Sequence, residues 1–71
     1  MMNLTKEQVR VAKLLLRWLI QLGHAKQFAR TEISAFLKKY SASKLLWAME
    51  QTNCTSLENL KVILKYGNDN T

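Results

Sequence analysis

The residues best suited to catalysis in this sequence are its single histidine, His24, and its single cysteine, Cys54. A thiol beside an imidazole can act as a nucleophile, and a cysteine just ahead of a helix can have a lowered thiol pKa. Nothing in the spacing brings the two residues together, and metal sites usually need several such ligands. We therefore expect His24 to face solvent or cap a helix, and Cys54 to be a small, half-buried loop residue.

The five acidic residues and the two glycines also lack the spacing that catalytic sites use. No pair of carboxylates suits glycoside hydrolysis or a carboxylate metal site, and Gly23 and Gly67 cannot form a phosphate-binding loop. A single cysteine excludes an internal disulfide framework and a zinc site built on paired cysteines. The sequence predicts no enzyme and no catalytic, cofactor or metal site.

Basic residues dominate the charge, with 11 lysines and arginines against 5 acids and a net charge of +6. Residues 1–44 contain nine basic and two acidic residues, a net charge of +7, whereas residues 45–71 contain two basic and three acidic residues, a net charge of −1. Charge concentrated in one half of a chain indicates a nucleic-acid backbone, an anionic membrane or an acidic protein as the partner.

A basic stripe runs along the first predicted helix, which spans residues 6–22 between Thr5 as N-cap and Gly23. Its members are Lys6, Arg10, Lys13 and Arg17. At about 100° per residue they lie within about 60° of one another, so they can either follow DNA phosphates or form the solvated face of the helix. About 240° of the remaining circumference is apolar, wider than an ordinary surface helix requires. We therefore expect this helix at the centre of the bundle or against a second subunit, and we predict a homodimer.

Three further helices complete the prediction. Thr31 is expected to cap a helix over 32–40, which residues 24–30 can extend, and Ser41 is expected to cap one over 42–52. The segment 55–58 has the pattern of a capping box before a last helix that ends at Gly67. The expected core faces comprise Ile33, Phe36, Leu37, Tyr40, Ala42, Leu45, Leu46, Met49, Leu57, Leu60, Ile63 and Leu64. No segment alternates with period two, so we predict an all-α, compact four-helix bundle without a sheet, in a single domain over 1–71 with a frayed tail at 67–71.

The helices over 32–40 and 42–52, joined by a short turn, have the layout of a helix-turn-helix. The second helix would enter the major groove, where Lys44 and Gln51 meet phosphates or base edges beside Ser41 and Ser43. Further phosphate contacts are expected from Lys38, Lys39, Arg10, Lys13 and Arg17. The first functional hypothesis is therefore a small basic DNA-binding protein that regulates transcription.

Trp47 supports an alternative. It is predicted on the outward face of its helix, between Lys44 and Gln51, where an exposed aromatic side chain is typical of a protein interface. A tilted helix would instead pack Trp47 under a neighbouring helix. An interface of Trp47, Trp18 and Leu14 would make the protein an adaptor or inhibitor, of the kind phages and mobile elements encode, that binds an acidic partner.

The apolar runs are far shorter than the roughly 20 residues a membrane span requires. Basic residues recur through the first segment, unlike the pattern of a signal peptide. Together with the single cysteine, this leads us to expect a cytoplasmic protein. Adsorption of residues 6–22 to an anionic membrane is a third hypothesis, disfavoured because the leucines of this helix are needed in the core.

Overall fold

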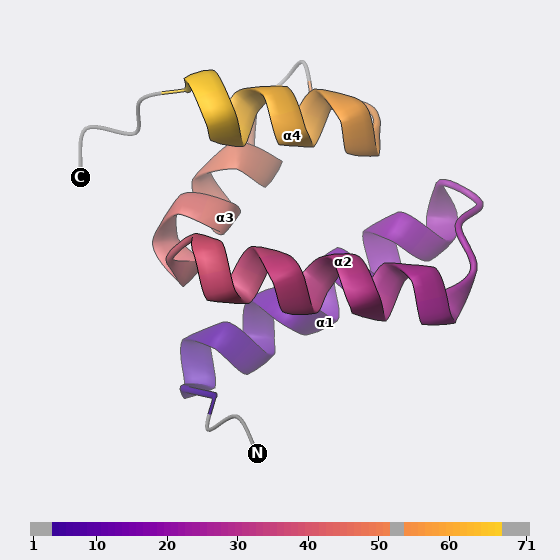
Figure 1. The fold of residues 1–71 in the computed structure, drawn as a ribbon, viewed down its shortest axis with the longest axis horizontal. Helices are drawn as coiled ribbons and strands as arrows, with labels where there is room; N and C mark the ends of the chain where they lie inside the picture. The colour runs from indigo at the N-terminus through magenta and orange to yellow at the C-terminus, as the bar shows by residue number, and fades with distance from the viewer. Residues whose placement is uncertain (1–3, 52–53, 68–71) are drawn as a thin grey trace.

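The computed structural model describes residues 4–51 and 54–67, and these residues form four helices and no strand. The helices are α1 (Lys6–Gln21), α2 (Lys26–Lys39), α3 (Ala42–Met49) and α4 (Leu57–Tyr66) (Figure 1). The predicted all-α, four-helix fold is confirmed. The predicted frayed tail, apart from Gly67, lies outside the described residues.

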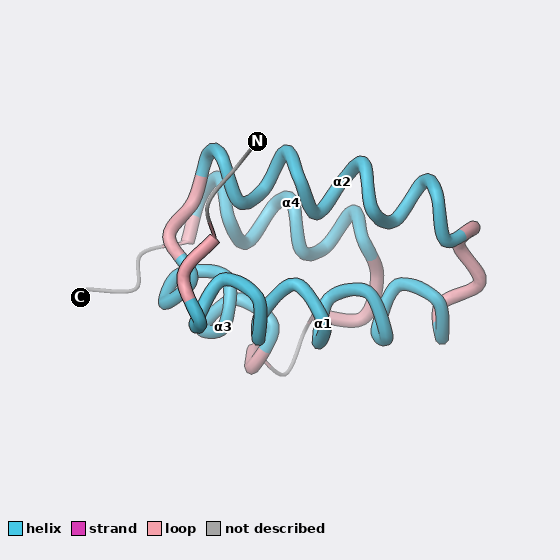
Figure 2. Tube along the Cα trace, turned by 90° about the horizontal axis from the view of Figure 1, so that it is seen from below, coloured by secondary structure: helices cyan, strands magenta, loops and turns pink. Residues whose placement is uncertain are grey.

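The helices form two layers, which Figure 2 shows edge-on. In one layer α2 and α4 lie side by side and run in the same direction, and an ion pair joins them between Lys61 Nζ and Glu32 Oε1 at 2.8 Å. The other layer contains α1, which runs antiparallel to α2, and α3. Because α1 packs on α2 and α3, and α3 packs on α4, α3 connects the α1–α2 hairpin to the last helix.

Local sequence explains most helix ends. The Thr5 hydroxyl accepts from the Gln8 backbone N–H, and the Gln8 side chain accepts from the Thr5 N–H, which completes a capping box at the start of α1. The Ser41 hydroxyl accepts from the Lys44 N–H at the start of α3. After α1 the chain turns at Gly23 with φ of 100°, a conformation that side chains with a Cβ rarely adopt. These three predicted positions are confirmed.

The predicted N-caps of α2 and α4 are wrong, whereas the extension of α2 into residues 24–30 is confirmed. Helix α2 begins at Lys26 after Ala25, and the Thr31 hydroxyl donates to the Gln27 carbonyl inside the helix instead of capping it. The N-cap of α4 is Ser56, whose hydroxyl accepts from the Asn59 N–H, so the expected capping box between Thr55 and Glu58 does not form. Helix α3 ends at Met49, three residues earlier than predicted.

The core forms where the four helices meet. Its buried residues are Val11, Leu15, Leu19, Ala29, Ile33, Phe36, Leu37, Ala42, Leu45, Ala48, Leu57, Leu60, Ile63 and Leu64. All four apolar residues predicted for the core face of α4 are buried, whereas Tyr40, Leu46 and Met49 are only half-buried. No helix among the described residues is both long enough and apolar enough to cross a membrane.

Helix α1 is not enclosed at the centre of the bundle, contrary to the prediction. One face of it is buried, whereas apolar side chains on its flanks stay partly in solvent: Val9 is 38% exposed, Leu14 41% and Ile20 45%. The reason is that α1 packs chiefly on α2 and α3, which leave the rest of its surface uncovered (Figure 2). The apolar surface of α1 is therefore wider than the part that the monomer buries.

Candidate nucleic-acid interface

The predicted basic stripe of α1 is exposed. Its four members, Lys6, Arg10, Lys13 and Arg17, are all in contact with solvent. Measured around the helix at about 100° per residue, they lie opposite the face formed by the buried Val11, Leu15 and Leu19. The stripe therefore faces away from the core, where an extended anion can reach it.

The two lysines at the end of α2 are also exposed. Lys38 and Lys39 occupy the last turn of the helix, where positive charge stabilises the helix dipole. The Lys39 ammonium lies 5.7 Å from the centre of the Tyr40 ring, and the Lys44 ammonium lies 5.6 Å from the same ring. Contacts of this kind leave the charge available to a phosphate, because the ring neutralises no charge.

The residues expected to read base edges are less accessible. Of the eight residues of α3, only Ser43 is exposed, because α3 packs on both α1 and α4. Lys44 is half-buried over Tyr40. Gln51 lies beyond the end of α3, and its side-chain amide donates to the Trp47 carbonyl at 2.9 Å. The turn between α2 and α3 is as short as a helix-turn-helix needs, but the side chains of α3 are committed to packing.

The basic stripe of α1 is therefore not brought together with the predicted base-reading residues of α3, whereas Lys39 and Lys44 meet over the Tyr40 ring. Helix α3 packs on the core side of α1, whereas the basic stripe lies on the opposite side. The predicted phosphate-binding residues are all exposed, and so are Ser41 and Ser43, whereas Lys44 and Gln51 are half-buried.

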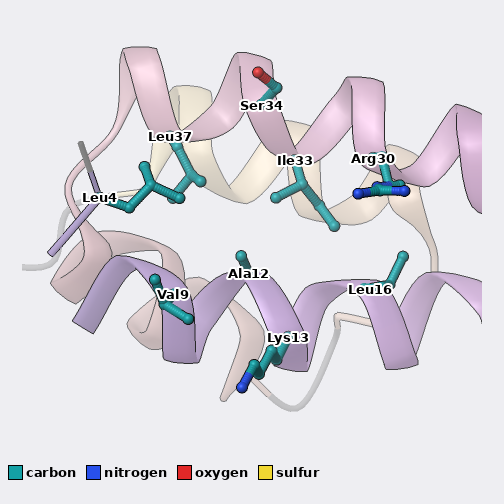
Figure 3. A pocket seen from close by; sticks show the side chains of 9 residues that line it. All are labelled: Leu4, Val9, Ala12, Lys13, Leu16, Arg30, Ile33, Ser34 and Leu37. Atoms are coloured by element: carbon teal, nitrogen blue, oxygen red, sulfur yellow. The ribbon is translucent and has the colours of Figure 1, made fainter. Parts of the chain in front are cut away.

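Sequence reasoning missed Arg30, which lies across a groove from Lys13 (Figure 3). Arg30 lies in the first half of α2, ahead of the predicted helix over 32–40 and within its possible extension through 24–30. The helix-forming composition of residues 24–30 was the available signal, and extending the helix to Lys26 would have placed Arg30 one turn from Ile33 and Ser34.

The groove between α1 and α2 has a volume of about 290 Å³. Figure 3 shows Ile33 and Leu37 of α2 pointing toward Ala12 and Leu16 of α1, with Leu4 beside Leu37 at one end. The remaining lining residues are Val9, Lys13, Arg30 and Ser34. Apart from the two cations and one hydroxyl, the groove is apolar.

Trp47, the centre of the predicted protein interface, is half-buried and packs against the core. Its ring lies against Gly67 after α4, so close that a Cβ on that glycine would be 2.7 Å from Cη2 of the ring. Of the two alternatives for Trp47, packing under a neighbouring helix is confirmed, because α4 covers the face of α3 that seemed free in the isolated helix. Trp18 is likewise half-buried, and Leu14 alone of the three predicted interface residues is exposed.

The two residues suited to catalysis have different surroundings. His24 follows the turn after α1 and packs on Phe28, with 5.2 Å between ring centres. Burial raises the pKa of the Cys54 thiol, opposite to the lowering that a helix N-terminus could have produced. Within residues 4–51 and 54–67 no three His, Cys, Asp or Glu side chains gather where they could hold a metal ion.

Comparisons with protein-family models, with curated proteins and with solved structures gave no match to this chain.

Proposed function

We propose that this protein binds double-stranded DNA through the phosphate backbone and acts as a small basic regulatory protein. The observation that supports it best is the basic stripe of α1, whose four cations are exposed and face away from the core. Among the described residues the one ion pair is Lys61 with Glu32, so none of the four has a carboxylate of the described residues to neutralise it. Cations in that state gain the most from releasing counterions when they meet phosphates.

The proposal assigns phosphate contacts to α1 and to the exposed Lys38 and Lys39, and it assigns little base reading to α3. A helix that reads the major groove must present several side chains to base edges. Helix α3 presents Ser43 alone, so we expect binding that depends weakly on DNA sequence. We also propose that the protein regulates transcription. Its proposed location is the cytoplasm, where DNA and reduced thiols coexist.

Fluorescence anisotropy on a labelled random-sequence duplex, repeated over a range of salt concentrations, tests the proposal. The six phosphate contacts assigned to α1, Lys38 and Lys39 predict a slope of about −5.4 in a plot of log K against log salt. Replacing Arg10 and Arg17 with glutamine should reduce the magnitude of that slope by about 1.8.

Lys26→Gln is the matched control, because Lys26 is an exposed cation at the start of α2, at the opposite end of that helix from Lys38 and Lys39, and it is assigned no phosphate contact. It should leave the slope unchanged. If this control and Arg10→Gln reduced the magnitude of the slope equally, DNA binding would depend on the overall charge of the protein and not on a particular surface. Strong weakening by Lys44→Ala and Gln51→Ala, seen on one sequence only, would instead support base reading by α3.

A further inference from the structure

The groove between α1 and α2 combines an apolar floor with cations on both sides. Val9, Ala12 and Leu16 contribute the floor from α1, and Ile33 and Leu37 contribute it from α2 (Figure 3). Val9 is 38% exposed, and Ala12 and Leu16 are half-buried, so the α1 side of the floor is open to a ligand, whereas Ile33 and Leu37 are buried at its base. DNA phosphates cannot form ion pairs or hydrogen bonds with an apolar floor, so DNA binding does not explain this part of the surface.

The two sides of the groove carry charge of one sign. Lys13 stands on the α1 side and Arg30 on the α2 side. No acidic residue lines the groove: Glu32 is turned to the α4 side of α2, where it pairs with Lys61, and Glu7 lies about 120° around α1 from Lys13. An apolar ligand flanked by negative charge would match both features of this surface.

We propose that the α1–α2 groove binds an acidic amphipathic helix of a partner protein. From Val9 to Leu16 the groove follows about 10 Å of α1, roughly two helical turns. A docked helix would place apolar side chains at i, i+3 and i+7 on the floor, and its carboxylates would reach Lys13 and Arg30. The inference does not rest on DNA binding, although both would use Lys13.

A second copy of this chain is a poorer occupant. In a two-fold dimer the same patch of both subunits meets. Closing the groove in that way would bring Lys13 and Arg30 toward the same cations of the partner subunit, with no carboxylate in either groove to separate them. Like charges facing each other across an interface destabilise it.

The first test uses a fluorescein-labelled synthetic helix of about 14 residues with leucines at i, i+3 and i+7 and glutamates beside them. Its control is a peptide of the same composition in which the leucines are scattered around the helix. The amphipathic peptide should bind at least about tenfold more tightly. Equal affinities would overturn the proposal, because charge alone would then explain the binding.

The second test compares two exposed valines on two helices. Val9→Ser removes a floor side chain, whereas Val62→Ser makes the same change on α4 at a valine that is 54% exposed. Val9→Ser should weaken the amphipathic peptide by about tenfold and leave DNA affinity unchanged, and Val62→Ser should alter neither. Circular dichroism checks that both variants fold. Equal peptide affinity for both variants would overturn the proposal.

Amide chemical shifts of the unaltered protein locate the bound peptide without any substitution. Adding the amphipathic peptide should shift resonances of residues 9–16 and 30–37, and shifts confined to other segments would overturn the proposal. It would equally be overturned if the groove resonances responded only to dilution of the protein, which would identify a second copy, or only to phosphatidylglycerol vesicles. Loss of DNA binding with retained peptide binding would refute the proposed function alone.

Discussion

Replacing Gly67 with alanine tests how Trp47 is packed. A Cβ at this position would lie 2.7 Å from Cη2 and 2.9 Å from Cζ3 of the Trp47 ring, and it would also press on the Ile63 carbonyl oxygen. Carbon atoms prefer separations of about 3.5–4.0 Å. The backbone conformation of Gly67 adds no strain, because its φ of −72° suits any residue. The cost of Gly67→Ala is therefore steric.

Overpacking of this kind costs about 1–3 kcal/mol in the free energy of unfolding. For a domain of this size, a loss of 2 kcal/mol corresponds to a drop in Tm of about 8–16 °C. Thermal melts followed by circular dichroism, with urea denaturation to check that the m-value is unchanged, measure it. A Gly67→Ala variant that melts like the wild type would refute the packing of Trp47 and revive the exposed interface that the sequence suggested.

A double-mutant cycle separates the ring contact from other effects of the alanine. Trp47→Phe removes Cη2 and Cζ3, so the cost of Gly67→Ala should fall by about 1 kcal/mol in that background. Gly23→Ala is the matched control: its φ of 100° makes alanine strained, but nothing lies within 4 Å of the new Cβ. Its cost, about 1 kcal/mol, should be the same with Trp47 or Phe at position 47.

Two further predictions concern Cys54 and Leu14. Because burial raises the thiol pKa of Cys54, Ellman's reagent should modify it more slowly than glutathione at pH 7.5, and a faster reaction would show that the thiol is activated. The folded state holds this proton more tightly than the unfolded state. Stability should therefore be full below the ordinary thiol pKa of about 8.5 and fall as the pH rises above it, a loss that Cys54→Ser removes. The predicted homodimer should sediment at twice the mass of one chain at tens of micromolar. Leu14→Ser, at a side chain that is 41% exposed, should return it to the monomer whereas Val9→Ser should not, and a monomeric wild type would contradict the dimer.

The groove and the basic stripe differ in how far sequence could reveal them. The stripe follows from helical spacing within one segment, so its position was predictable from residues 6–17 alone. The placement of Lys13 and Arg30 on opposite sides of the groove was not predictable from sequence. It depends on how α2 lies against α1 and on the extension of α2 to Lys26.

Sequence alone determined the features that neighbouring residues decide. The number of helices, the caps at Thr5 and Ser41, the turn at Gly23 and the core face of α4 all follow from periodicity and hydrogen bonds within a few residues.

Tertiary structure alone decided which apolar faces are covered. Trp47 is half-buried because α4 returns over α3, and α1 is half-exposed because α2 and α3, on which it chiefly packs, leave the rest of its surface uncovered. Burial depends on segments far apart in the chain, and periodicity cannot specify which of two apolar faces a distant helix will cover. For the same reason the charge of +6 identified a basic protein, but the fold was needed to show that two of its cations, Lys13 and Arg30, border an apolar groove.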